Sequence, residues 1–339
     1  MKRSFAGILA ASALVASFAL APAANAADVS ITGTGSSYDN AIFTACVDAA
    51  PGVKVTYSKT SSGSGRSGFA NKTVTFGAMD WLYTAADTVR PTFKYTYVPV
   101  IAGPIVVAYN VPGLNLKLDA TTLSKILQGK ITSWDDAAIA KINKGAKLPS
   151  QKIVVVYRST TSGTTQNLAA YMRDLLPNAG WKDSAAFLTA SGNTTATTSA
   201  ADNATLIKTV KSTAYSIGYA DLADTLTAGV QAAAIKNGAG AYVAPSVPAT
   251  AKFIAAQSMA TTGQVRFDYE TPVKGGYNLS LVSYAAAPTA AGTPEAAALK
   301  TWLNAYLNTC APAKAAGLGY VPLSGSFKTT ALKLVAKIG

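Results

Sequence analysis

Histidine is absent from this chain of 339 residues, and cysteine occurs only twice. Without an imidazole group, the Ser-His-Asp and Cys-His mechanisms of hydrolysis are excluded, and so are the usual zinc sites. Two cysteines are also too few for a four-cysteine metal site. The sequence therefore predicts no metal centre and no cofactor, and any hydrolytic activity would have to work without imidazole.

Long hydrophobic runs are lacking beyond the first 26 residues. Residues 5–21 are mainly apolar, follow Lys2 and Arg3, and are succeeded by the small residues 24–26. This pattern is typical of a signal peptide that is cleaved near Ala26. Because no later run reaches about 18 uninterrupted apolar residues, we expect no membrane-spanning helix and a soluble, exported mature protein.

Clustered positive charge is also lacking, although the net charge is +13. The basic residues are scattered, and no run of five occurs. A nucleic-acid-binding protein would need a basic stripe, so we expect no nucleic-acid partner. A diffuse positive field suits the attraction of a small anion, and it is equally compatible with no specific role.

The two cysteines, Cys46 and Cys310, lie near opposite ends of the chain, each in a segment with helical spacing. In an oxidising compartment, two cysteines form a disulfide more often than a metal site. A disulfide here would join the N-terminal and C-terminal parts of the chain. Two buried free thiols remain the alternative.

Segments with strand and helix patterns alternate along the chain, which predicts an α/β protein with helices on both faces of mixed sheets. The expected strands are residues 29–32, 53–57, 74–78, 95–102, 105–110, 153–157, 217–219 and 279–284. The expected helices are residues 40–50, 120–128, 135–143, 166–176, 203–212, 220–226 and 293–307. Loops are expected at residues 58–68, 190–204 and 233–247.

Four loops that follow expected strands share one chemistry. Residues 34–38, 60–65 and 158–165 are rich in hydroxyl groups and glycine, and residues 79–80 add the carboxylate of Asp80. Arg158 ends its strand directly before six hydroxyl residues, one glycine and the start of a helix. Hydroxyl groups, a guanidinium and free N–H groups around one point attract a small oxyanion. Ligands of open α/β sheets bind beyond the carboxyl ends of strands, so these loops predict an oxyanion cage.

These segments resemble the periplasmic phosphate-binding proteins of bacterial ABC transporters. The resemblance rests on residues 31–38, 60–65, 75–80, 101–113, 126–136, 158–165 and 216–220, which occur in the order of the family. Its most specific part is Gly-Lys-Ile-Thr-Ser-Trp-Asp-Asp at residues 129–136. There Trp134, Asp135 and Asp136 are expected to pack and to cap a helix.

The resemblance implies a type II-like periplasmic-binding-protein fold with two lobes, each a mixed-sheet domain. Lobe I would comprise residues 27–110 and 279–339, after a signal peptide at residues 1–26, and lobe II residues 111–278. Two chain crossings, near residues 109–110 and 278–279, would form the hinge. Both cysteines would then lie in lobe I.

The resemblance also implies the residues of a phosphate site. The donors would be Ser37, the backbone of Tyr38, Ser62, Arg158, Ser162, Gly163 and Thr164. Asp80 would accept the hydrogen of a P–OH group. Phosphate keeps such a hydrogen near pH 7 and sulfate does not, so a buried carboxylate would favour phosphate and repel sulfate.

The chain departs from the family in the loop after Arg158. Thr160 stands where the family usually has an Asp that orients the arginine, and Thr161 stands at a common glycine position. More ordinary roles are also open for the charged residues. Asp80 could cap a short helix over residues 81–86, Arg158 could form a surface ion pair, and Arg66 is expected to be a solvated loop arginine rather than part of the cage.

The function implied is capture of inorganic phosphate and its delivery to a membrane ABC transporter permease, by a periplasmic, monomeric protein that is not an enzyme. Two alternatives from other classes remain. A secreted phosphatase built on the same cage would turn over phosphate esters. A structural surface protein with the same fold would bind no small anion.

Overall fold

The computed structural model describes Met1, residues 28–85 and residues 87–339. The expected signal peptide lies outside the described residues, apart from Met1. Nine strands form one mixed sheet in the order β2-β1-β3-β14-β4-β8-β6-β7, with β9 paired to β4. These strands are β1 (Val29–Gly35), β2 (Val53–Lys59), β3 (Phe76–Met79), β4 (Tyr95–Tyr109), β6 (Val154–Arg158), β7 (Thr198–Ala200), β8 (Ser216–Asp221), β9 (Gln231–Ala232) and β14 (Ser280–Pro288). The expected α/β class is confirmed, but the strands expected in two sheets are joined into one.

Strand β4 joins the two halves of this sheet. The sequence predicted two strands on either side of Gly103 and Pro104, whereas the structure has one strand of 15 residues. Pro104 is the last β4 residue paired with β14, and Ile105 is the first paired with β8. The two residues therefore mark a change of partner rather than a turn. Gly103 is required by close packing, because a Cβ there would lie 2.2 Å from the Tyr38 hydroxyl oxygen.

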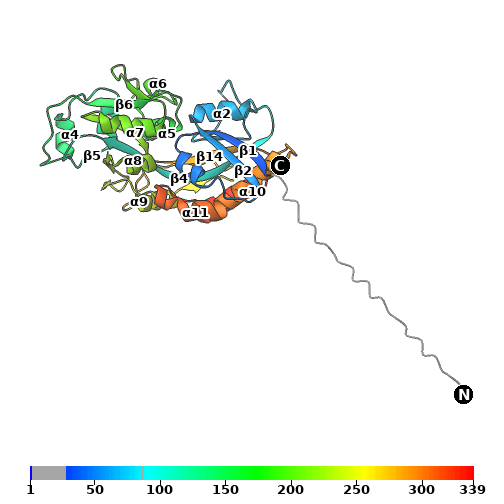
Figure 1. Cartoon of the computed structure of the whole chain (residues 1–339). Coiled ribbons are helices and arrows are strands. Elements are labelled where there is room, and N and C mark those ends of the chain that lie inside the picture. The colour runs from blue at the N-terminus through cyan, green and yellow to red at the C-terminus, as the bar shows by residue number, and fades with distance from the viewer. Residues whose placement is uncertain (2–27, 86) are drawn as a thin grey trace.

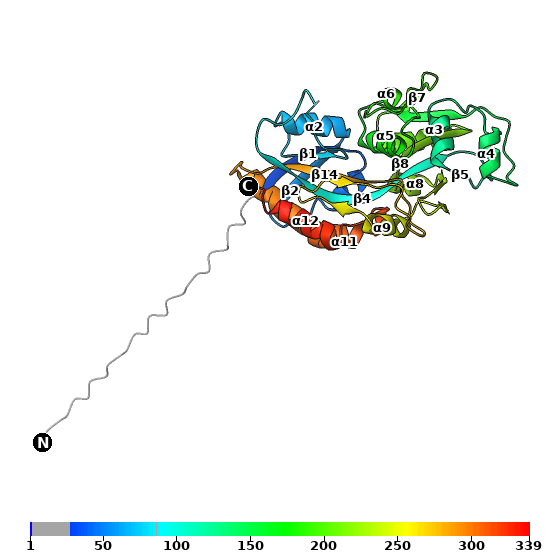
Figure 2. The ribbon, with the colours of Figure 1, turned by 180° about the vertical axis from the view of Figure 1, so that it is seen from behind.

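Helices cover both faces of the sheet. They are α1 (Asn40–Ala45), α2 (Ser62–Ala70), α3 (Ala120–Leu127), α4 (Ala137–Ile142), α5 (Gly163–Leu175), α6 (Phe187–Ser191), α7 (Asn203–Ser212), α8 (Leu222–Ala228), α9 (Val247–Ala255), α10 (Pro294–Ala305), α11 (Ala311–Lys314) and α12 (Gly325–Val335). A π-helical turn (Tyr306–Cys310) joins α10 to α11, and a 3₁₀ turn (Ala316–Leu318) follows α11. Figures 1 and 2 show α2 on one side of the sheet and α11 on the other. Both views also place α4 and α6 at the opposite end of the molecule from β1 and β2, with β4 between them.

Five short strands lie outside the large sheet. Strands β5 (Lys117–Leu118), β10 (Ala234–Lys236) and β11 (Tyr242–Val243) form a three-stranded sheet, in part of the region expected to be an irregular connection. Strands β12 (Ser258–Met259) and β13 (Val265–Arg266) form an antiparallel pair. Helices α9 and α12 were not predicted from the sequence.

Helix α2 replaces most of the expected loop over residues 58–68. Ser61 caps the helix, because its side chain accepts a hydrogen bond from the Ser64 N–H at 3.1 Å. The glycines of this segment serve close packing instead of a turn. A Cβ on Gly65 would lie 2.4 Å from the Ala78 carbonyl oxygen, and one on Gly63 would lie 1.9 Å from Thr161 Oγ1. The serine and glycine content therefore reflects how closely α2 packs on its neighbours.

Buried aromatic side chains anchor both ends of the sheet. Trp134 and Trp302 are fully buried. The predicted role of the Trp134 segment is confirmed, because the indole N–H donates to the Tyr215 carbonyl at 2.9 Å and Asp136 caps α4. Cys46 and Cys310 are joined by a disulfide that links α1 to the C-terminal helices across 264 residues of sequence.

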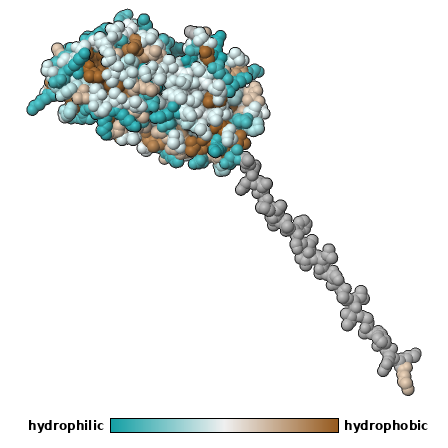
Figure 3. All heavy atoms as spheres, turned by 45° about the horizontal axis from the view of Figure 1, so that its top comes forward, coloured by the Kyte–Doolittle hydropathy of each residue, from teal (hydrophilic) through white to brown (hydrophobic). Residues whose placement is uncertain are grey.

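The face of the molecule that Figure 3 shows is mixed in polarity. Among the described residues, no helix combines the length and the apolar character that crossing a membrane would require. Figure 3 shows apolar side chains scattered in small groups among polar ones on the face in view. That face therefore presents no continuous apolar band.

Candidate functional site

The strand-end loops predicted from the sequence meet at one place in the structure. Arg158, the last residue of β6, donates from Nη1 to the Ser37 hydroxyl oxygen at 3.2 Å. Ser62, the first residue of α2, donates to Asp80 Oδ2 at 3.2 Å. Gly163, the first residue of α5, approaches so closely that a Cβ there would lie 2.3 Å from Asp80 Oδ2. The carboxyl ends of β1, β3 and β6 and the N-terminal ends of α2 and α5 thus surround one point.

The remaining predicted residues also lie at this point and are buried. Ser162 is the N-cap of α5 and accepts from the Thr165 N–H at 3.3 Å. Thr164 is 1 % exposed, and its hydroxyl oxygen accepts from the Asn203 side chain at 3.4 Å. The Tyr38 backbone N–H donates to the Ser36 hydroxyl at 3.1 Å. All eight predicted residues are therefore brought together within one buried polar cluster.

Asp80 is a buried carboxyl group surrounded by hydroxyl groups. It is 3 % exposed and accepts hydrogen bonds at Oδ2 from Ser36 at 2.9 Å and from Ser62, and at Oδ1 from Ser283 at 2.7 Å. Burial raises the pKa of Asp80, while these three hydrogen bonds and the charge of Arg158 oppose that rise. The helix-capping alternative is wrong, because residues 81–85 form no helix.

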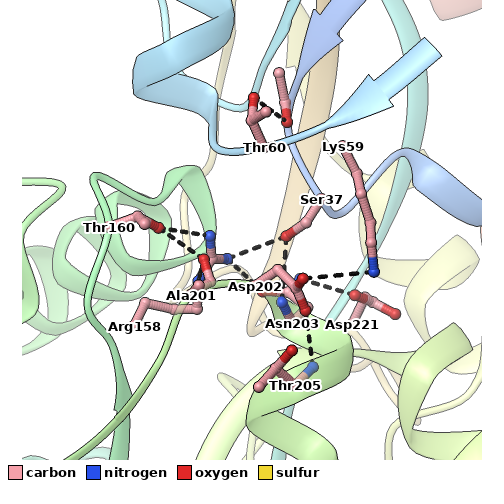
Figure 4. A network of polar contacts seen from close by, with 11 residues as sticks. Ser37, Lys59, Thr60, Arg158, Thr160, Ala201, Asp202, Asn203, Thr205 and Asp221 are labelled. Atoms are coloured by element: carbon pink, nitrogen blue, oxygen red, sulfur yellow. Dashed lines mark hydrogen bonds and ion pairs between the residues drawn. The ribbon is translucent and has the colours of Figure 1, made fainter.

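Arg158 is held by four hydrogen bonds in the interior. Besides Ser37, its Nη1 donates to Asn203 Oδ1 at 2.6 Å, its Nη2 to Thr160 Oγ1 at 2.9 Å, and its Nε to the Ala201 carbonyl at 3.2 Å (Figure 4). With 2 % exposure and no carboxylate partner among these contacts, it is not a surface ion-pair arginine. Burial lowers the pKa of Arg158, against the opposing effects of nearby acidic groups. Thr160 therefore orients the guanidinium through its hydroxyl group, together with Asn203 and a backbone carbonyl.

Direct contacts at the site connect the segments before residue 110 with those after residue 150. The Gly63 N–H donates to the Thr161 carbonyl at 3.2 Å, and Asn167 Nδ2 donates to the Asp80 carbonyl at 2.7 Å. Lys59 Nζ lies 3.4 Å from Asp202 Oδ2. These three contacts are polar and join the two sides of the site beside the buried cluster.

Comparison with known proteins decides the family. Residues 20–308 match the PBP superfamily domain. Over 243 residues, the chain is 30 % identical to the phosphate-binding protein PstS of Haemophilus influenzae, in an alignment that covers 68 % of this chain and 69 % of that protein. The chain belongs to the PstS-like phosphate-binding protein family. This is a family of binding proteins, which sets aside the phosphatase alternative.

Other relatives match over shorter regions. The phosphate-binding protein PstS of Pasteurella multocida is 33 % identical over 228 residues, covering 64 % of this chain and 63 % of that protein. The protein PstS 3 of Mycobacterium leprae is 40 % identical over 137 residues, 39 % of this chain and 37 % of that protein. The aligned region thus spans between about a third and two thirds of the length of these two relatives.

Solved structures of phosphate-binding proteins share the fold. The periplasmic phosphate-binding protein PfluDING, bound with phosphate, aligns with a TM-score of 0.72 at 20 % identity, covering 89 % of this chain and 92 % of that one. A putative phosphate ABC transporter substrate-binding protein with bound phosphate from Clostridium perfringens aligns with a TM-score of 0.64 at 16 % identity, covering 87 % and 100 %. At these identities, the likeness concerns the fold alone.

Sequence reasoning missed further polar residues of this cluster. Asn203 links Arg158 to Asp221, because its Nδ2 donates to Asp221 Oδ2 at 2.7 Å. Burial, followed by the charge of Asp224, raises the pKa of Asp221 well above its ordinary value. Asp221 ends β8, so the strand-end argument applied to this strand would have found it. Ser36 directly precedes the predicted Ser37 and lies in the hydroxyl-rich loop 34–38, but it was not named as a separate site residue.

Arg66 differs from its predicted character. It is 8 % exposed, lies 4.6 Å from the ring centres of both Trp81 and Tyr83, and pairs with Asp87 at 2.5 Å. The expected solvated arginine is therefore wrong, because the aromatic residues after Asp80 enclose the guanidinium. In this position Arg66 ties the segment after Asp80 to α2 and makes no contact with Arg158 or Ser37.

A large surface cavity lies away from these residues. It has a volume of about 580 Å³ and is lined by Phe69, Lys72, Phe93 and Lys94, among others. None of the eight predicted site residues lines it. A smaller cavity of about 130 Å³ reaches Asp80 beside Trp81. The chemistry of the buried cluster, rather than cavity size, therefore identifies the candidate site.

Proposed function

We propose that this member of the PstS-like family captures inorganic phosphate and delivers it to the permease of a membrane ABC transporter. The binding residues of this proposal are Ser37, Tyr38, Ser62, Asp80, Arg158, Ser162, Gly163 and Thr164. The observation that carries it is Asp80, a buried carboxyl group that lies among hydroxyl groups in the same cluster as the Arg158 guanidinium. A ligand that both accepts many hydrogen bonds and offers one hydrogen fits this arrangement.

Phosphate satisfies this requirement, whereas sulfate does not. The Arg158 guanidinium and the hydroxyl groups of Ser37 and Ser62 are suited to the phosphoryl oxygens, with charge-assisted hydrogen bonds from the arginine. Asp80 then accepts from P–OH, whereas sulfate would place an unprotonated oxygen against the carboxylate. A site that requires a hydrogen bond can reject an analogue that lacks it by about 10⁴–10⁵-fold.

A two-lobe architecture accompanies this proposal. Lobe I comprises residues 27–110 and 279–339, lobe II comprises residues 111–278, and the chain crosses near residues 109–110 and 278–279. Polar contacts between the two sides of the site support this division. The partner of β4 changes from β14 to β8 between Pro104 and Ile105, five residues before the proposed crossing. Closure of the lobes around the anion is the proposed motion. The disulfide lies within lobe I, so it leaves the hinge free.

Location and partners follow from the same proposal. The protein acts in the periplasm as a monomer, after export directed by residues 1–26, and has no nucleic-acid partner. The PfluDING protein is described as periplasmic, and the Clostridium perfringens protein as the substrate-binding protein of a phosphate ABC transporter. These descriptions of relatives with the same fold support the proposed setting.

Isothermal titration calorimetry on the protein that begins at residue 27 tests the proposed ligand. We expect one phosphate to bind per chain and sulfate to give no heat at the same concentrations. Arg266→Gln is a control for loss of positive charge outside the site, because Arg266 is an exposed residue of β13, and it should bind phosphate as the wild type does. Binding of a different oxyanion without binding of phosphate would refute the proposal.

A further inference from the structure

Ser283 holds its hydroxyl group between two buried carboxyl groups. Its Oγ lies 2.7 Å from Asp39 Oδ2 and 2.7 Å from Asp80 Oδ1, and the Met79 carbonyl oxygen is 3.3 Å away. Ser283 lies on β14 where the pairing with β4 shifts register, between Ser283 and Tyr284. Such irregularities commonly aim a side chain toward a site. Asp39 and Asp80 are thus connected through a single hydroxyl group.

One hydroxyl group cannot serve two ionised carboxylates in this geometry. A serine has one hydrogen to donate and two lone pairs that accept. If both carboxyl groups were ionised, one of the two 2.7 Å contacts would bring lone pairs together with no hydrogen between them. A second hydrogen is therefore needed, and only a protonated carboxyl group can supply it.

The surroundings decide which carboxyl group is protonated. Asp80 receives two further hydrogen bonds from Ser36 and Ser62, which favour its ionised form. Asp39 is fully buried, and its Oδ1 has no hydrogen-bond partner among the described residues. Although Asp39 precedes α1, its side chain makes no capping bond to that helix. The negative charge is therefore better placed on Asp80 and the hydrogen on Asp39.

We propose that Asp39 is a neutral carboxylic acid at pH 7 that donates to Ser283, and that Ser283 in turn donates to the ionised Asp80. In this relay, Asp39 and Ser283 are positioning residues, since neither is assigned to the ligand. They keep Asp80 an acceptor for the P–OH group. This consequence rests on the proposed function, whereas the protonation of Asp39 does not depend on a ligand.

The groups packed around Asp39 are consistent with a neutral acid. The titratable groups whose charges affect the pKa of Asp39, or whose pKa is affected by the charge of Asp39, are Asp80, Asp221 and the phenol groups of Tyr38, Tyr57, Tyr306 and Tyr320. All of these are acids and none is a cation, so none of them would stabilise an ionised Asp39. Burial, followed by the charge of Asp80, raises the pKa of Asp39 well above its ordinary value.

The relay is expected to maintain the preference for phosphate over sulfate to lower pH than a site without it. With the Ser283 hydrogen committed to Asp80, the carboxylate resists protonation as the pH falls. A protonated Asp80 would become a donor, and a fully ionised anion such as sulfate would then be tolerated. Loss of the relay is therefore expected to admit sulfate at mildly acidic pH while phosphate binding near neutral pH is retained.

Infrared difference spectroscopy on the ligand-free protein tests the protonation directly. Subtracting the spectrum of Asp39→Asn from that of the wild type at pH 7 should reveal the carbonyl band of a protonated acid, and Ser280→Ala, a buried serine of the same strand, should leave that band unchanged. A carboxylate band in its place would overturn the proposal. If Asp39→Asn does not fold, carbon-13 NMR of aspartate-labelled wild type, with Asp39 identified by its proximity to Ser283, gives the same decision.

Binding measurements then test the consequence for selectivity. Asp39→Asn exchanges one neutral donor for another. Its phosphate affinity should therefore stay within about threefold of the wild type between pH 6 and 8. A tenfold change in affinity would equal the free energy of a shift of one pKa unit. A tenfold or larger gain in phosphate affinity would show that an ionised Asp39 repels the anion and would overturn the proposal.

For Ser283→Ala, the preference for phosphate over sulfate at pH 5 should fall at least tenfold. An unchanged preference would contradict the role of Ser283 in selectivity. Absence of phosphate binding in the wild type would refute the proposed function while leaving the infrared result intact.

Discussion

Replacement of Gly163 by alanine separates closure of the site from stability of the fold. Gly163 begins α5, and its φ is not in the left-handed region, so alanine is compatible with the backbone. The added Cβ would nevertheless lie 2.3 Å from Asp80 Oδ2 and 2.5 Å from both Asp80 Cβ and Ser62 Oγ. Ordinary contacts of a Cβ begin at 3.4 Å, so the N-terminus of α5 must withdraw by about 1 Å.

This displacement sets the size of the expected effect. A misplacement of about 1 Å at a preorganised site costs on the order of 10²-fold in function, and we expect phosphate affinity in Gly163→Ala to fall by about that factor. The melting temperature should stay within a few degrees of the wild type, because alanine favours a helix over glycine by up to about 1 kcal/mol. Calorimetry gives the affinity, and thermal unfolding monitored by circular dichroism gives the stability.

Gly317→Ala is the matched control. Gly317 lies in the 3₁₀ turn after α11, and a Cβ there would meet no atom within 4 Å. This variant should bind phosphate as the wild type does. Wild-type affinity in Gly163→Ala would refute the placement of α5 against Asp80 in the bound form.

Three further perturbations follow from the structure. Arg158→Lys keeps the charge but cannot maintain the contacts with Ser37, Thr160 and the Ala201 carbonyl together, so calorimetry should show at least a hundredfold loss of phosphate affinity; a loss below threefold would contradict the assigned role. Reduction of the Cys46–Cys310 disulfide should lower the melting temperature, because a disulfide that closes so long a loop contributes up to about 5 kcal/mol to the free energy of unfolding. Phosphate affinity should stay within twofold of the wild type. A large change in affinity would contradict the placement of the disulfide away from the hinge. Because the folded-state pKa of Asp39 is raised, the wild type loses stability as pH rises from the ordinary aspartate value toward the raised one, by up to about 1.4 kcal/mol per pH unit. The stability of Asp39→Asn relative to the wild type should therefore increase between pH 4 and 7 in chemical denaturation, and a constant difference would contradict this.

Local sequence patterns were sufficient to predict the α/β class and the strands that form the site. Short β-branched runs with hydroxyl-rich ends identified the loops around Ser37 and Arg158, because strand ends and helix starts are encoded locally. The eight individual site residues were instead implied by the family resemblance, and the structure places them in one cluster. Helix α2 was missed because its glycines are required by contacts with Ala78 and Thr161, and these neighbours are distant in sequence.

Residues that depend on distant partners could not be predicted. Asp39 and Ser283 are separated by 244 positions, and only the folded sheet brings the serine of β14 beside the carboxyl group. Arg66 was misjudged for the same reason, since its burial depends on Trp81 and Tyr83 folding back over it. The continuity of β4 through Pro104 likewise depends on its two partner strands.

The preference for phosphate over sulfate, measured by calorimetry in the wild type and in Asp80→Asn, tests the central claim most directly. The asparagine side chain can donate to an unprotonated oxygen, which the Asp80 carboxylate cannot do. We predict a preference on the order of 10⁴–10⁵ in the wild type that falls at least a hundredfold in Asp80→Asn, with sulfate binding gained. An unchanged preference in the variant would contradict the account.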